Sequence, residues 1–185
     1  MAWIAGALLA LAGFVTLPVA LRSSRLSRGT VRVLAVCGVL LGAAASVLGL
    51  IDHRTVPPWF AAPAAALAAV GLGAAVTLAV LSSTRIAAET LAGAPAQEPA
   101  ASSDPGAELL RGGALIGVFE RLAIVSTLLA GWPEGLAVVL AVKGLGRFAE
   151  LKATKQGAAE RFILGTLVSV LTAAACAGTA RLISG

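Results

Sequence analysis

Long, continuous blocks of apolar residues, separated by short polar segments, constrain the fold of this chain more than any other feature. Each block is close to the roughly 20 residues that an α-helix needs to cross a bilayer. The blocks are rich in Leu, Ala and Val and lack the alternation of barrel strands, so helices are expected. The sequence therefore predicts an all-α fold, a polytopic transmembrane helical bundle of about six spans. The predicted spans are residues 2–21, 31–51, 59–82, 112–131, 134–151 and 159–181.

Charged residues are too few for a soluble domain of this length. They make up 12% of the chain, whereas soluble domains carry about a quarter. The net charge of +5 would suggest nucleic acid as the partner of a soluble protein, but here most basic residues lie in loops between apolar blocks. Tyr is absent, and no basic stripe with interleaved aromatic residues is present. We therefore expect the lipid bilayer as the partner and no nucleic-acid binding.

The basic residues of the connections predict the orientation in the membrane. Cytoplasmic loops are enriched in Lys and Arg. The first, third and fifth connections are therefore expected in the cytoplasm, with both termini outside and Trp59 and Trp132 at the outer interface. An Arg-over-Lys, Ala- and Gly-rich composition is typical of a GC-rich bacterial source, which predicts the bacterial cytoplasmic (inner) membrane as the location. The basic residues that predict the orientation are Arg22, Arg25, Arg28, Arg85, Arg111, Lys152 and Lys155.

The longest connection divides the chain into two halves. Its Pro, Ala, Ser and acidic residues cannot form a hydrophobic core, so residues 84–111 are predicted to be a flexible cytoplasmic linker. Residues 1–83 then form an N-terminal three-helix scaffold without interior charges, in which Gly38 and Gly42 permit close helix packing. Residues 112–185 form a C-terminal three-helix unit that carries the charges.

Residues that could catalyse a reaction or bind a metal are scarce. The chain has one His, His53, in a predicted outer loop, and two cysteines, Cys37 and Cys176, within apolar blocks. It has no HExxH motif and no set of Ser, His and Asp. The sequence therefore predicts no catalytic residue, no metal site and no cofactor. Enzymatic activity is the least favoured class and is left open.

Two charges lie well inside the C-terminal blocks. An ionisable residue within a membrane is costly and is by default a functional candidate. Glu120 lies nine residues beyond Arg111, which corresponds to a depth of about 13 Å at 1.5 Å per residue. Lys143 lies nine residues before Lys152. We therefore expect Glu120 and Lys143 at similar depth on consecutive helices, with their head groups in direct or water-bridged contact.

Helical spacing adds further charges to these two. On the fifth span, Lys143, Arg147 and Glu150 fall at i, i+4 and i+7 and share one face. Short turns allow the polar stripes of the last three spans to face one another. Arg121 follows Glu120 and must face elsewhere, either snorkelling or meeting another helix. The candidate ligand- or ion-binding residues are Glu120, Lys143, Arg147, Glu150, Glu160 and Arg161; for the last four, a position among lipid headgroups is the alternative.

Three segments of the C-terminal half resemble a family of bacterial multi-pass inner-membrane proteins that has no assigned function. They are Gly117–Arg121, Ala141–Lys152 and Ala159–Ser169, within residues 112–172. The chain differs from the family pattern in having Val142 between Ala141 and Lys143. The resemblance implies that the C-terminal half is the functional unit and implies no specific activity.

Two functions from different classes remain. The first is transport or binding of a small anionic solute, a lipid headgroup or a proton at the intramembrane charged cluster. The alternative is a structural or assembly subunit of a membrane complex, in which the charges fix helices to one another. Anionic lipid or a small anionic solute is the partner in the first case. A second copy of the chain or another membrane subunit is the partner in the other, and the oligomeric state is left open.

Overall fold

The structure is a computed structural model that describes residues 2–22, 26–51, 56–92, 106–153 and 158–185. These residues form six α-helices and no strand. The all-helical fold predicted from the sequence is therefore confirmed for this part of the chain. The helices are α1 (Ala2–Arg22), α2 (Arg28–Ile51), α3 (Pro58–Ala92), α4 (Gly106–Leu129), α5 (Gly135–Ala153) and α6 (Ala158–Ser184).

Four helices of the described chain are long and apolar enough to cross a membrane. They include the segments Trp3–Leu21, Arg28–Ile51, Pro58–Thr84 and Ala159–Ser184. In α5 the apolar stretch is shorter, Gly135–Gly146. The structure thus shows a helical bundle that is compatible with a membrane, with four strong candidate spans.

The centre of the bundle is α3, which packs against α1, α2, α4 and α6. It approaches α1 most closely where Gly71 faces Gly13. A Cβ at Gly13 would lie 2.5 Å from the backbone N of Ala68, and a Cβ at Gly71 would lie 2.5 Å from the carbonyl O of Gly13. Such distances are available only to glycine, so these two residues set the spacing of α1 and α3. Alanines such as Ala65, Ala68 and Ala69 complete this tightly packed core.

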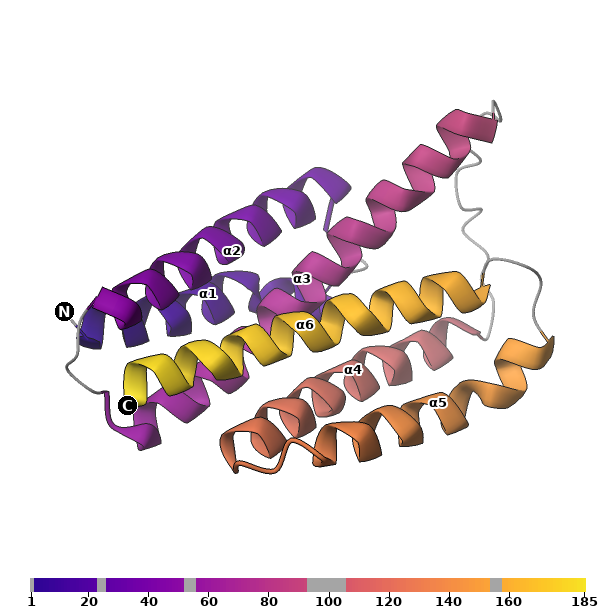
Figure 1. Cartoon of the computed structure of the whole chain (residues 1–185). Coiled ribbons are helices and arrows are strands. Elements are labelled where there is room, and N and C mark those ends of the chain that lie inside the picture. The colour runs from indigo at the N-terminus through magenta and orange to yellow at the C-terminus, as the bar shows by residue number, and fades with distance from the viewer. Residues whose placement is uncertain (1, 23–25, 52–55, 93–105, 154–157) are drawn as a thin grey trace.

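The last helix, α6, lies mainly against α3 and also contacts α2 and α4. Figure 1 shows α6 between the α1–α2 layer and the α4–α5 hairpin, with its end at the same end of the bundle as the start of α1. At this end the backbone N of Val56 donates a hydrogen bond to the carbonyl O of Ile183, at 2.6 Å. Further from the end, the hydroxyls of Ser46 on α2 and Thr179 on α6 are 2.8 Å apart. These contacts join helices from both halves of the sequence.

The helices α4 and α5 form an antiparallel hairpin with a tight turn. Gly131 has a positive φ of 74°. The backbone N of Trp132 donates to the carbonyl O of Thr127 at 2.9 Å, and that of Gly131 donates to Leu128 O at 3.2 Å. This is the Schellman arrangement that ends helices at glycine. The helix α5 packs mainly against α4 and lies at the edge of the bundle (Figure 1).

Helix boundaries differ most from expectation around the predicted linker. The helix α3 continues beyond residue 82 to Ala92, and α4 begins at Gly106 instead of residue 112. The added segments contain Ala, Leu and Glu, which favour helix without needing to be buried in lipid. The other predicted linker residues, 93–105, lie outside the described part of the chain.

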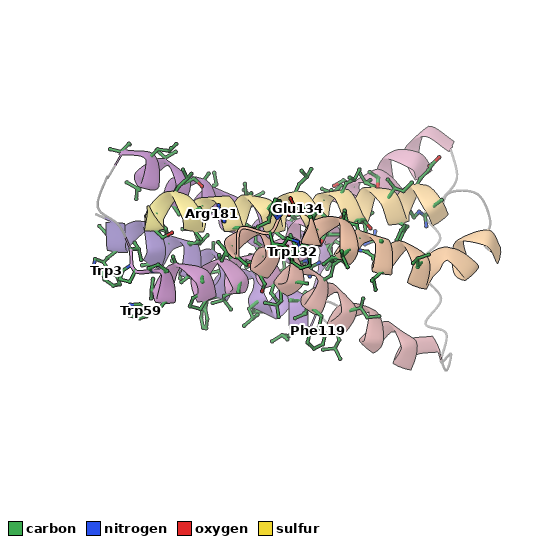
Figure 2. The ribbon with its side chains drawn as sticks, turned by 60° about the horizontal axis from the view of Figure 1, so that its bottom comes forward. Trp3, Trp59, Phe119, Trp132, Glu134 and Arg181 are labelled. Atoms are coloured by element: carbon green, nitrogen blue, oxygen red, sulfur yellow. The ribbon has the colours of Figure 1, made fainter. Side chains whose placement is uncertain are left out.

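Aromatic residues gather at the end of the bundle where α1 and α3 begin. The ring centroid of Trp3 lies 6.5 Å from that of Trp59 and 5.7 Å from that of Phe60. Both tryptophans are exposed. Figure 2 shows Trp3 and Trp59 at this end, with Trp132 and Glu134 of the α4–α5 turn further along the bundle. The α4–α5 turn therefore lies away from the end of the bundle that carries Trp3 and Trp59.

Candidate functional site

Two consecutive residues of α4, Glu120 and Arg121, are charged and buried, each with 8% of its surface exposed. Neighbouring residues on a helix point about 100° apart, so they reach different partners. Glu120 faces α5, whereas Arg121 faces α3 and α6.

Glu120 and Lys143 form an ion pair between α4 and α5. The Nζ of Lys143 donates to both carboxylate oxygens of Glu120, at 2.6 Å from Oε1 and 2.5 Å from Oε2. The Glu120 side chain is 6% exposed and that of Lys143 is 20% exposed. The predicted contact between these residues is therefore confirmed. It forms because Glu120 and Lys143 lie 11 and 12 residues on either side of Gly131 in an antiparallel hairpin.

A residue of α6 also reaches this pair. The Nζ of Lys143 lies 5.8 Å from the centre of the Phe162 ring. An ammonium group at this distance over an aromatic face gains a cation–π attraction. Lys143 is therefore held by a carboxylate from α4 and by an aromatic ring from α6.

Arg121 extends across α3 to reach α6. Its Nε donates to the Oγ of Ser169 at 3.0 Å. The path is open only because residue 73 is glycine: a Cβ there would lie 2.6 Å from Nε and 2.7 Å from Cδ of Arg121. The Nη atoms turn back toward Gly117, where a Cβ would lie 3.5 and 3.7 Å from them. Of the two positions expected for Arg121, contact with another helix is therefore the one observed.

No carboxylate among the described residues contacts Arg121. Among the residues that the structure describes, the only salt bridge is the one between Glu120 and Lys143. Within the same part of the chain, the guanidinium of Arg121 has one hydrogen-bond partner, the neutral hydroxyl of Ser169. The described parts of α4 and α5 therefore hold one buried cation, Arg121, one partly buried cation, Lys143, and one buried anion, Glu120.

The other predicted site residues are exposed or lie outside the described side chains. Glu160 and Arg161 are exposed in the first turn of α6. The carboxylate of Glu160 suits a helix N-terminus, where negative charge is favoured. Arg147 and Glu150 belong to α5, and their side chains lie outside the described part of the structure. Of the six candidates, the structure brings together Glu120 and Lys143.

Three residues that contribute to the Arg121 contact were not candidates from the sequence. They are Arg121 itself, Ser169 and Gly73. Ser169 belongs to a polar stripe that the sequence shows on α6, but the stripe faces α3 and α4 instead of α5. A glycine directly opposite an arginine gives no signal in a single sequence, because the pairing depends on how the helices pack.

The described residues contain no group of three or more His, Cys, Asp or Glu that could hold a metal ion. What the arrangement offers is positive charge in a buried position, with hydrogen-bond donors from a guanidinium group. Neither protein-family models nor curated proteins nor solved structures gave a match to this chain. The resemblance of residues 112–172 to a bacterial membrane-protein family stays a prediction.

Proposed function

We propose that this protein is a bacterial inner-membrane protein that binds a small anionic group, a solute or a lipid headgroup, at Arg121. Transport or handling of that ligand would be its activity. The observation that carries the proposal is the buried guanidinium of Arg121, whose only partner among the described residues is a neutral hydroxyl. The neighbouring carboxylate, Glu120, is already engaged by Lys143.

A buried charge such as that of Arg121 needs a counter-charge. A charged side chain inside a membrane costs several kcal/mol unless it is paired or hydrated. An anion bound to Arg121 offsets this cost and accepts charge-assisted hydrogen bonds, which are roughly twice as strong as neutral ones. Carboxylates and phosphates suit the planar guanidinium fork best.

The proposed topology has about six spans, with both termini outside and the linker in the cytoplasm. It is supported by the start of α1 and the end of α6 lying at the same end of the bundle (Figure 1). Single cysteines introduced as Ala101→Cys and Gly185→Cys, in a background without Cys37 and Cys176, test the orientation. In intact cells an impermeant thiol reagent should label the second and not the first. Labelling of the first from outside would reverse the assignment.

The number of spans depends on how far the α4–α5 hairpin reaches. Variants that retain one tryptophan, either Trp132 or Trp59, can be placed in bilayers of lipids brominated at different depths. With six spans, both tryptophans are quenched most strongly by bromine near the headgroups. Strong quenching of Trp132 alone by bromine near the bilayer centre would show that the hairpin turns within the membrane. The chain would then have four spans.

Anion binding is tested with the purified protein in detergent. Inorganic phosphate should raise the unfolding temperature, relative to chloride at equal ionic strength, and Arg121→Gln should abolish the effect. Arg161→Gln is the matched control, because Arg161 is an exposed arginine of the same half. Arg121→Lys keeps the charge and should retain weaker binding. Equal responses of wild type and Arg121→Gln to phosphate would refute the proposal.

A structural role is the second candidate, and the direct contact of Glu120 with Lys143 favours it. In this case the pair serves to fix α5 against α4. Replacing either residue alone leaves a buried charge and should be destabilising, whereas exchanging them, Glu120→Lys with Lys143→Glu, should restore part of the stability. A restored stability together with unchanged phosphate binding would separate the ion pair from the anion site. An exchange as damaging as the sum of both single changes would refute the pairing.

A further inference from the structure

Two buried threonine hydroxyls, those of Thr77 on α3 and Thr166 on α6, have no hydrogen-bond partner among the described residues. This sets them apart from most hydroxyls within these helices. A Ser or Thr in a helix commonly donates to the carbonyl three or four residues earlier. The hydroxyls that lie within hydrogen-bond distance of such a carbonyl are those of Thr16, Ser46, Ser82, Ser83, Thr84, Thr127, Thr172, Thr179 and Ser184. Two unsatisfied hydroxyls therefore remain in a nonpolar interior, where each is costly.

Both threonines lie one helical turn from the residues that contact Arg121. Thr77 follows Gly73 by four residues on α3, and Thr166 precedes Ser169 by three residues on α6. Thr77 faces α6, because its Cγ2 is 3.8 Å from where a Cβ of Gly165 would be.

The Nη atoms of Arg121 turn in the same direction along the bundle. They lie near Gly117, one turn before Arg121 on α4. Beyond Gly73, α3 runs toward the connection that joins α3 to α4. The helices α4 and α6 run in the opposite direction, away from that end of the bundle. About one turn closer to that connection than Gly73, Arg121 and Ser169 lie, in the same order, Thr77, Gly117 and Thr166. They therefore belong to one layer of the bundle.

The groups in this layer can all donate hydrogen bonds. The two Nη atoms of Arg121 carry four N–H bonds, and each threonine adds one O–H. A water molecule would satisfy the hydroxyls but would leave the guanidinium without a counter-charge. An oxyanion accepts hydrogen bonds from both kinds of donor and neutralises the charge.

We infer that Arg121, Thr77 and Thr166 form an oxyanion site between α3, α4 and α6, for a phosphate or carboxylate group. The inference rests on the proposed function and specifies its ligand class and two further binding residues. Gly117 belongs to the same site because the absence of a side chain leaves space beside both Nη atoms. A lipid headgroup and a free solute can both supply the oxyanion.

Thr77→Val and Thr166→Val test the site in the detergent-purified full chain titrated with inorganic phosphate. Each should weaken the apparent affinity about tenfold, the usual effect of one hydrogen bond to a charged group. Without phosphate, each variant should be as stable as wild type or more stable, because no hydrogen bond is lost. Thr172→Val is the matched control: its hydroxyl donates to Val168 O at 2.8 Å, so it should lose stability and keep its affinity.

Gly117→Ala provides an independent test. A Cβ at Gly117 would make ordinary van der Waals contact with the Nη atoms at 3.5 and 3.7 Å. The helix should therefore tolerate alanine, while the methyl group occupies the space of the oxyanion. We expect equal or higher stability without phosphate, because alanine favours the helix, and a reduction of phosphate affinity of at least tenfold.

The outcomes separate this inference from the proposed function. If phosphate binds to wild type and depends on Arg121 but not on Thr77 or Thr166, the threonine site is wrong and the proposed function stands. Binding of a lipid headgroup is tested by comparing the stability of the protein in nanodiscs of phosphatidylglycerol with its stability in nanodiscs of phosphatidylcholine. Stabilisation by phosphatidylglycerol that the threonine variants reduce, without a response to free phosphate, assigns the site to a lipid headgroup. If neither phosphate nor phosphatidylglycerol stabilises wild type, both proposals are refuted.

Discussion

The contact between α1 and α3 and the contact between α4 and α5 are built in opposite ways. In the first, Gly13 and Gly71 let two backbones approach until a single added carbon would collide with main-chain atoms. In the second, the ion pair of Glu120 and Lys143 joins two helices that share few other contacts. The first contact has a close approach of two backbones, and the second has a pair of charges in addition to close packing at its turn.

This difference has a physical consequence. Close packing in a membrane relies on dispersion forces and small residues, so it tolerates almost no change of volume. An ion pair tolerates changes of shape but requires its partner, since loss of one charge strands the other. The α1–α3 region should therefore be rigid, whereas the α4–α5 hairpin should be the part that opens first.

Gly13→Val should give the largest loss of stability. The new side chain would meet the backbone of Leu67 and Ala68 at distances near 2.5 Å, and overpacking of this kind costs about 3 kcal/mol. Gly178→Ala is the control, since a Cβ there would meet nothing within 4 Å; it should raise stability by up to about 1 kcal/mol. Unfolding in detergent measures both. A Gly13→Val variant as stable as the control would show that α1 and α3 can separate without penalty.

Lys143→Met should increase local unfolding of α5 more than that of the other helices. Breaking a buried pair costs 3–5 kcal/mol, and the partial exposure of Lys143 reduces this to about 2 kcal/mol. Local opening of α5 should then increase by roughly 30-fold, because 1.36 kcal/mol corresponds to a factor of ten. Hydrogen exchange read by mass spectrometry locates the change. An equal increase in the rate of hydrogen exchange in α1–α3 would mean that the hairpin does not unfold independently of these helices.

Arg181→Met should have a smaller effect on the same hairpin. The Nη2 of Arg181 donates to the carbonyl O of Leu128 at 2.7 Å and so satisfies the C-terminal end of α4. Because this contact is exposed, its loss should cost about 1 kcal/mol. Hydrogen exchange at the turn should increase, and Arg161→Met should leave it unchanged. The idea fails if both variants exchange alike.

Thr179→Val should have the smallest effect, on the interface of α2 with α6. The Thr179 and Ser46 hydroxyls are 2.8 Å apart, and such interhelical hydrogen bonds contribute about 0.6 kcal/mol in membranes. A double-mutant cycle with Ser46→Ala isolates the pair. A coupling energy indistinguishable from zero would show that the two hydroxyls act independently.

The helices could be predicted from the sequence because continuous apolar blocks leave few other ways to satisfy backbone groups. Residue spacing also predicted the contact of Glu120 with Lys143, since a short turn forces equal depth on antiparallel helices. The end of α3 was missed because Ala and Leu beyond residue 82 prolong a helix whether or not lipid surrounds it.

The position of Arg121 could not be predicted, because the rotation of α4 about its axis depends on which helices surround it. The sequence suggested that α6 would turn its polar stripe toward α4 and α5. In the structure α6 packs chiefly on α3, and Ser169 meets Arg121 there. Which helices become neighbours depends on how small residues such as Gly73 fit against the facing helix. A single sequence does not show which residue such a glycine faces.

The packing of α6 on α3 also determines when the bundle can be completed during synthesis. The ribosome makes α6 only after α4 and α5, so one side of α3 lacks its main neighbour while α1 and α2 are already in place. In that interval the α3 side chains that meet α6, including those of Thr77 and Leu81 beside Gly165, can be covered only by lipid or by another protein. A chain that stops before α6 is therefore expected to be recognised and degraded by membrane quality control, even though its first three helices are intact.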